Sequence, residues 1–187
     1  TPLEEVAKLV HSVGAYTIVD ASQMIAHAPV CMDDADLDVL VFSGHKIYAP
    51  GSPGVVIAKK NLLNAISPSE LGGGMVDDVS LAKYVTTKNL PDREEAGTPN
   101  IVGAIILGAV LDLLVRVGMD TIREKEIGLI DYTWNNLTLI DGVTVYGPNP
   151  AEIPRTGTIS FNIKGFDHGL TAAALNDYYN IQLFSNK

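Results

Sequence analysis

Five side chains with complementary chemistry follow two apolar stretches near the start of the sequence. Asp20 ends the first stretch, AYTIVD, and Gln23 comes shortly after it. Ser43 ends the second stretch, DVLVFS, and His45 and Lys46 follow directly. Ligands of open α/β sheets bind beyond the carboxyl ends of the strands. If both stretches are strands, this acid, amide, hydroxyl, imidazole and amine meet at one edge of a sheet.

This combination suits pyridoxal 5'-phosphate (PLP), a cofactor with a cationic ring nitrogen, a phenolate and a phosphate. The lysine of a PLP enzyme forms a Schiff base, and a carboxylate beside the ring nitrogen keeps that nitrogen protonated, so that the ring acts as an electron sink. Lys46 is predicted to be the amine and Asp20 the carboxylate. The alternative is that Asp20 caps a turn and Lys46 is a surface charge, which are the commoner roles of these residue types.

The elements that must position these residues alternate between helix and strand, which predicts an α/β fold. Apolar residues at helical spacing predict a helix over 3–13, and β-branched runs predict strands over 15–20, 38–43 and 54–60. Residues 67–100 are rich in turn residues. A run this long favours a functional role or an interface over a plain connection.

The second half of the sequence predicts two long helices and a smaller lobe. Pro99 suits the first turn of a helix that ends at Val117, and a second helix spans about 119–139. A further helix is predicted over 169–179. Three strands complete this half, namely VTVYG, GTISFNI and NIQLF.

Length and composition suggest more than one body. With 187 residues and 47% apolar content, the chain can bury one core and a small second lobe. We place the boundary near residue 115, which gives the parts 1–115 and 116–187. The sequence lacks an initiating Met, opens within a helical pattern and stops in an apolar stretch. We therefore expect it to be a piece of a longer protein.

Charge and cysteine content narrow the classes of partner and site. The net charge of −9 argues against a nucleic acid or an acidic membrane surface, because phosphates select clustered Lys and Arg. No apolar run reaches the roughly 18 residues of a membrane span. The single cysteine, Cys31, rules out an internal disulfide and a Cys-rich metal site, and fits a reducing compartment such as the cytoplasm. Because free cysteines are commonly buried and inert, Cys31 is predicted to be a small packing residue.

Three motifs, in order along the chain, resemble the class V aminotransferase family, and within it the Suf-type cysteine desulfurases and selenocysteine lyases. They are D-x-x-Q at Asp20–Gln23, S-G-H-K at Ser43–Lys46 with Pro50-Gly51 behind it, and R-x-E-x-G-T-P at Arg93–Pro99. The resemblance spans essentially the whole chain. It implies an α/β fold, the PLP-dependent transferase fold type I, with residues 1–115 belonging to the PLP-binding large domain and 116–187 to the small C-terminal domain.

The resemblance also implies a role for each predicted site residue. Asp20 would contact the pyridine nitrogen of the cofactor, and Gln23 its phenolate oxygen. Ser43 and His45 would contact the phosphate, and Lys46 would form the Schiff base. No metal is implied.

A homodimer follows from the same resemblance, because Thr98 would reach the phosphate in the neighbouring subunit. The run Gly72-Gly73-Gly74 fits the family's glycine-rich loop near that interface, or is a plain flexible loop. Two residues depart from the family pattern. Glu94 stands where an aromatic residue is usual, and Phe184 occupies the slot of the arginine that binds the substrate carboxylate, so that either substrate recognition differs or the alignment shifts there.

The expected function is that of a PLP-dependent enzyme acting on a small amino acid. The resemblance favours cysteine desulfuration, in which cysteine becomes alanine and sulfur passes to an enzyme cysteine beyond this sequence and then to an acceptor protein. Cys31 cannot replace that nucleophile, so the piece alone is expected to be inactive. The alternatives are another class V reaction (aminotransferase, epimerase, selenocysteine lyase or kynureninase-like) and a non-catalytic relative.

Overall fold

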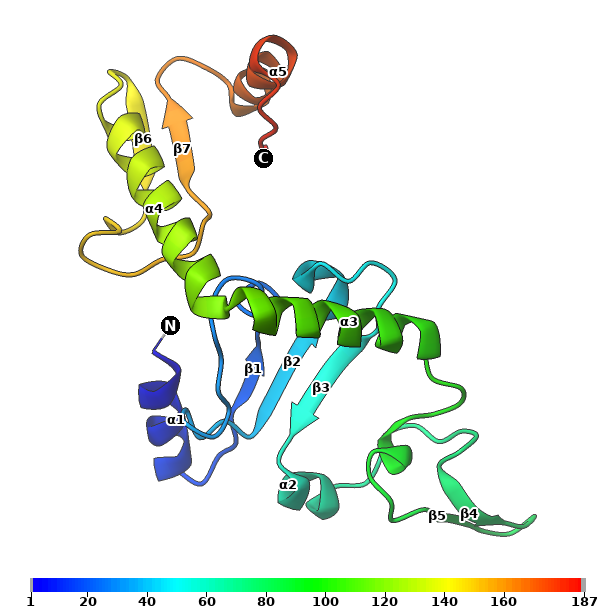
Figure 1. Ribbon diagram of the computed structural model, residues 1–187. Coiled ribbons are helices and arrows are strands. Elements are labelled where there is room, and N and C mark those ends of the chain that lie inside the picture. The colour runs from blue at the N-terminus through cyan, green and yellow to red at the C-terminus, as the bar shows by residue number, and fades with distance from the viewer. Residues whose placement is uncertain (1, 186–187) are drawn as a thin grey trace. The chain divides into compact units, whose positions relative to one another are not determined.

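A three-stranded sheet forms the centre of the first part of the chain (Figure 1). The structure is a computed structural model that describes residues 2–185. β1 (Ile18–Asp20) and β2 (Val39–Ser43) are parallel neighbours, and β3 (Gly54–Ala58) pairs antiparallel with β2. The parallel pair therefore ends at one edge of the sheet, as the sequence predicts, while β3 runs back from that edge.

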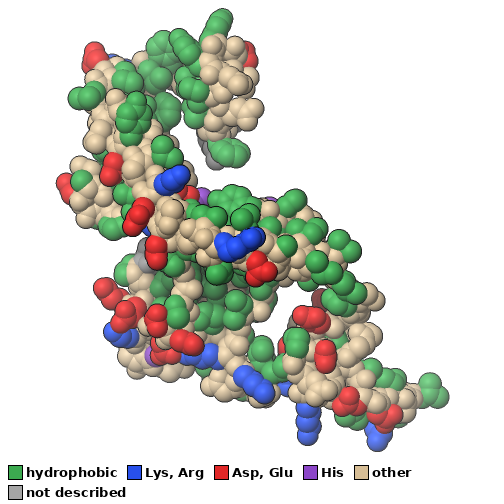
Figure 2. Space-filling view, viewed as in Figure 1, with side chains coloured by type: hydrophobic (Ala, Val, Ile, Leu, Met, Phe, Trp, Pro, Cys, Tyr) green, Lys and Arg blue, Asp and Glu red, His purple; other side chains and the backbone are tan. Residues whose placement is uncertain are grey.

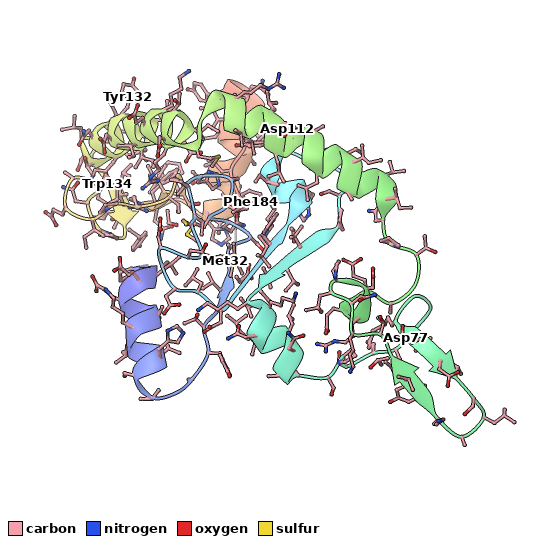
Figure 3. All side chains as sticks on the ribbon, turned by 60° about the horizontal axis from the view of Figure 1, so that its bottom comes forward. Met32, Asp77, Asp112, Tyr132, Trp134 and Phe184 are labelled. Carbon is pink, nitrogen blue, oxygen red and sulfur yellow. The ribbon has the colours of Figure 1, made fainter. Side chains whose placement is uncertain are left out.

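A small apolar core joins this sheet to α1 (Leu3–Ser12) and to the connection between β1 and β2. Leu37 and Leu40 are 1% and 2% exposed, and Ala7 and Ala21 are buried with them. Full burial of a leucine side chain contributes roughly 1.5–3 kcal/mol. Seven partly buried side chains pack against this cluster: Leu3, Val19, Met24, Ile25, Val30, Met32 (labelled in Figure 3) and Ala35. The connection that carries Gln23 is thus anchored on the core.

A polar network around Asp38 holds the opposite edge of the sheet. The Oδ2 atom of Asp38 accepts hydrogen bonds from the backbone N–H and the hydroxyl of Thr17, at 2.8 and 3.1 Å, and lies 2.8 Å from His11 Nε2. Lys59 Nζ lies 3.1 Å from its Oδ1. Burial alone would raise the pKa of the Asp38 carboxyl, but these hydrogen bonds outweigh it and hold the pKa far below its usual range. The network therefore ties α1 to all three strands.

The stretch predicted to be rich in turns contains more regular structure than its sequence suggests. After α2 (Lys60–Ala65), β4 (Val76–Val79) and β5 (Tyr84–Thr86) form an antiparallel hairpin, and a short helix, η2 (Asp92–Glu94), follows. Most residues of β4 and β5 are exposed. Because neither strand has one face in a core, VDDV and YVT do not alternate between apolar and polar residues, which is the pattern that predicts a strand from sequence.

Two consecutive helices, α3 (Ile101–Val117) and α4 (Met119–Thr138), connect the two compact units of the chain, Thr1–Met119 and Asp120–Lys187. Gly118 separates the helices at φ 86°, a left-handed conformation that favours glycine. Figure 2 shows hydrophobic side chains along α3. Within residues 2–185, no single helix is long and apolar enough to cross a membrane.

The second unit packs α4 beside a two-stranded sheet and a further helix. β6 (Val143–Tyr146) pairs antiparallel with β7 (Ser160–Ile163), and α5 (His168–Tyr179) follows. Trp134 of α4, labelled in Figure 3, is 9% exposed, and the Arg155 guanidinium lies 5.0 Å from the centre of its ring. This cation–π contact fixes the loop between the two strands against the helix.

The prediction of a strand over NIQLF is wrong. Residues 181–185 form no strand, and Asn180 adopts a left-handed conformation at φ 56° that ends α5. A strand requires a neighbour for its backbone N–H and C=O groups. Among the residues that the structure describes, none pairs with this stretch.

Candidate active site

The carboxyl ends of β1 and β2 meet at one edge of the sheet and bring the predicted side chains to it (Figure 1). Asp20 is the last residue of β1, and Ser43 is the last residue of β2. The chain then enters a single helical turn, η1 (Gly44–Ile47), which carries His45 and Lys46. The Ser43 hydroxyl makes no capping bond to this turn. The edge thus presents a hydroxyl, an imidazole and an amine beside a carboxylate.

Asp20 and Lys46 interact electrostatically across this edge. Hydrogen bonds from the side chain and the backbone of Ser22 lower the pKa of the Asp20 carboxyl, and the Lys46 ammonium lowers it further. The Ser22 backbone N–H donates to Asp20 Oδ1 at 2.9 Å. Asp20 is therefore ionised at neutral pH. Gln23 lies exposed in the turn that follows β1.

Close packing anchors the turn that carries Lys46. A Cβ atom added at Gly44 would lie 2.0 Å from Ser52 Oγ, so only glycine fits there. The Gly44 N–H donates to the Pro53 carbonyl at 3.3 Å, which closes the turn. Ile47 and Ala49 are 2% and 0% exposed and hold its base in the interior. The two polar side chains of η1 are exposed above this anchored backbone.

Thr98 lies on a separate segment that glycines support. Its side chain is exposed, and the N–H of the preceding residue, Gly97, donates to the Gly73 carbonyl at 2.8 Å. A Cβ atom at Gly72 would lie 3.1 Å from the Cβ of Ala96, which shows how closely the two segments approach. The run of three glycines therefore contacts the backbone on which Thr98 is carried.

Glu94 has a local partner in the same segment. The Arg93 guanidinium lies 2.9 Å from Glu94 Oε1 and also donates to the Leu63 carbonyl at the end of α2. The Arg93 side chain is only 12% exposed. The acid that departs from the family pattern thus balances a largely buried arginine and helps to hold this segment against α2.

Asn100 is a residue of this region that the sequence did not single out. Its Oδ1 atom accepts from the Gly103 N–H at 2.9 Å and caps α3, while its Nδ2 atom donates to the Gly51 carbonyl at 2.8 Å. An asparagine before an apolar helix is a recognisable cap signal. The bond to Gly51 leaves no signal in the sequence, because it joins residues far apart in the chain.

Two residues that the sequence brought into question, Cys31 and Phe184, are both exposed. The prediction that Cys31 is buried is wrong: it is exposed, because its neighbours Val30 and Met32 supply the packing against the core. Phe184, labelled in Figure 3, is fully exposed and belongs to the other unit. In the part of the chain that the structure describes, no cluster of three or more His, Cys, Asp or Glu side chains could hold a metal ion.

Similarity to known proteins covers nearly the whole chain. A family model for class-V aminotransferases matches residues 1–185. The chain is 40% identical over 184 residues to a probable cysteine desulfurase of Synechocystis, which covers 98% of this chain and 43% of that protein. It is 40% identical over 182 residues to a cysteine desulfurase of Pectobacterium atrosepticum, at 97% and 44% coverage. The chain therefore spans less than half the length of these curated relatives.

Solved structures show the same likeness. The apo structure of a cysteine desulfurase from Thermococcus onnurineus matches with a TM-score of 0.87 and 36% identity, over 94% of this chain and 44% of that one. The cysteine desulfurase CsdA from Escherichia coli matches with a TM-score of 0.86 and 31% identity, over 94% and 43%.

Proposed function

The chain belongs to the class-V aminotransferase family, and we propose that the intact protein is a PLP-dependent cysteine desulfurase. The fold class predicted from the sequence, α/β with the PLP-dependent transferase fold type I, is confirmed by the likeness to the two solved cysteine desulfurases. Because the chain spans less than half of its relatives, the reaction, the substrate and the partners are proposed for the intact protein.

The observation that supports this proposal most directly is Lys46 beside an ionised Asp20 at one sheet edge. A carboxylate that stays charged at neutral pH is what a protonated pyridine nitrogen needs beside it. Lys46 is exposed on an anchored turn, so its amine is accessible and would form the Schiff base with the aldehyde of the cofactor. When bound, PLP supplies an electron sink for the α-carbon of an amino acid.

The other predicted residues complete the proposed site. The Gln23 amide would donate to the phenolate oxygen, and the Ser43 hydroxyl and His45 imidazole would bind the phosphate. We further propose a homodimer, in which the partner subunit's Thr98 binds the same phosphate. In this proposal residues 1–115 and 116–187 are parts of the PLP-binding large domain and of the small C-terminal domain.

In the proposed reaction Lys46 takes a proton from the α-carbon of cysteine and returns protons as alanine forms. The thiolate of an enzyme cysteine outside these 187 residues attacks the substrate sulfur. The carbon–sulfur bond of the substrate breaks and a sulfur–sulfur bond forms, so cysteine and an enzyme thiol give alanine and an enzyme persulfide. A sulfur-acceptor protein would then remove the terminal sulfur.

Phe184 is the observation that favours a second candidate, a different class V reaction or a relative without turnover. An aromatic ring cannot replace the planar, bidentate fork with which arginine binds a carboxylate. The exposed position of Phe184 leaves open a substrate that is held by another group.

The proposal is tested by loading the intact protein with PLP and reducing it with borohydride. We expect a visible Schiff-base band that borohydride removes and a cofactor mass that stays on the Lys46 peptide. Lys46→Ala should lose both, whereas Lys60→Ala, an exposed lysine of α2, should keep both. A reducible band in Lys46→Ala would contradict the assignment.

The choice of reaction is tested with cysteine and a thiol reductant. Equal amounts of sulfide and alanine are expected from the loaded wild-type protein. Keto acid without sulfide would favour an aminotransferase. Cofactor binding without turnover of any amino acid would favour a non-catalytic relative.

A further inference from the structure

The turn that carries Lys46 and the segment that carries Thr98 are joined by one side chain, that of Asn100. Its Nδ2 atom donates to the Gly51 carbonyl at 2.8 Å, 49 residues away in the sequence. Gly51 closes the turn that begins at Gly44, and Thr98 lies just before the asparagine. We propose that Asn100 is a positioning residue that fixes the Lys46 turn for cofactor binding. This inference rests on the proposed function.

Backbone hydrogen bonds within residues 44–54 stabilise the turn, and Asn100 adds a hydrogen bond from outside it. The Ala49 N–H donates to the Gly44 carbonyl at 3.1 Å, and the Ser52 N–H donates to the Ala49 carbonyl at 3.2 Å. These bonds set the internal shape of the turn. The hydrogen bond from Asn100 to the Gly51 carbonyl comes from outside the turn, so it restrains where the turn as a whole lies relative to α3.

Gly103 shows how close this approach is. A Cβ atom at Gly103 would lie 2.5 Å from the Gly51 carbonyl oxygen and 2.5 Å from Asn100 Nδ2. Gly103 is also buried, so a larger side chain at this position could not turn into solvent. The first turn of α3 is thus in direct contact with the backbone behind Lys46, and the Asn100 amide occupies the junction.

Asn100 performs two tasks with two different atoms, which makes them separable. Its Oδ1 accepts from the Gly103 N–H and caps the helix, and its Nδ2 donates to the Gly51 carbonyl. Aspartate caps helices as well as asparagine and interacts favourably with the helix dipole. It has no donor, however, and would place a carboxylate oxygen against the Gly51 carbonyl. Asn100→Asp therefore keeps the helix cap and removes the hydrogen bond to the Gly51 carbonyl.

The first measurement needs no cofactor. Amide hydrogen exchange of the intact apo-protein should become faster across residues 44–54 in Asn100→Asp, whereas exchange in the body of α3 should stay as in the wild type. The matched control is Asn61→Asp, which adds the same charge to the exposed first turn of α2. Unchanged exchange over 44–54 would overturn the proposal, whatever the cofactor assignment.

The second measurement is the dissociation constant for PLP. One hydrogen bond contributes roughly 2- to 10-fold in an equilibrium constant, so Asn100→Asp should bind PLP about 2- to 10-fold more weakly. Gly103→Ala should weaken binding as well, because its Cβ forces the turn away while Asn100 remains. Wild-type affinity in both variants would reduce Asn100 to a helix cap. If the wild-type protein itself bound no PLP, the proposed function would fail, while the exchange result would still decide the role of Asn100.

Discussion

Replacing Asp38 by alanine is expected to destabilise the first unit while leaving unchanged the Lys46 edge, by which we mean the carboxyl ends of β1 and β2 with the turn η1. Asp38 is 5% exposed and lies at the edge of the sheet opposite Lys46. Its Oδ2 atom takes two hydrogen bonds from Thr17 and a contact from His11, and its Oδ1 atom faces Lys59. The substitution removes all of these side-chain interactions in one step.

The magnitude follows from what is left unpaired. Thr17 is 6% exposed, so its backbone N–H loses its acceptor in the interior, at a cost of about 1–3 kcal/mol. The Lys59 ammonium loses its contact with Asp38 but keeps Asp36. Breaking a buried pair by removing one partner typically costs about 3–5 kcal/mol. We expect a loss near the lower end of that range, about 3 kcal/mol.

Urea unfolding of the intact apo-protein, followed by far-ultraviolet circular dichroism, measures this loss as a lower midpoint at an unchanged slope. Asp34→Ala, an exposed acid in the same connection, is the matched control and should change stability by less than about 0.5 kcal/mol. A loss for Asp38→Ala no larger than that of the control would refute the reasoning. Weakened PLP binding at low urea would refute the claim that the two edges are independent.

Three further predictions concern single residues. Hydrogen bonding to Asp38 raises the pKa of His11, so the stabilisation by protonated His11 is complete below about pH 6.5 and is lost as the pH rises through the folded-state pKa. In melting curves at pH 6 and pH 9, His11→Gln should remove this contribution of His11 to the pH dependence of stability. Gly44→Ala should cost about 1–3 kcal/mol by overpacking against Ser52, and thermal melting should show recovery in the double variant with Ser52→Gly. Cys31→Ser should leave sulfide release from cysteine unchanged, because Cys31 lies in the connection between β1 and β2 and not at a strand end that carries the proposed site; a loss of activity would contradict its exclusion from the reaction.

The candidate site was largely predictable because its residues are close in sequence to the strands that carry them. Asp20 and Ser43 end the two parallel strands, and His45 and Lys46 follow within one helical turn. A strand direction and a short spacer suffice to bring such residues to one edge. The burial of Cys31 was mispredicted, because the fold packs its neighbours Val30 and Met32 against the core and leaves Cys31 exposed.

The residue pattern alone predicts the first helix, the three strands of the central sheet and the long helix of the first unit, and it contains the motifs that carry the candidate site. Three features arise from the folded chain: β3 runs antiparallel to β2, Asp38 is ionised in a buried network, and Asn100 donates to the Gly51 carbonyl. The physical reason is the range of the interactions. Propensity and hydrophobic period act over a few residues, whereas hydrogen bonds and desolvation join groups that only the folded chain brings together.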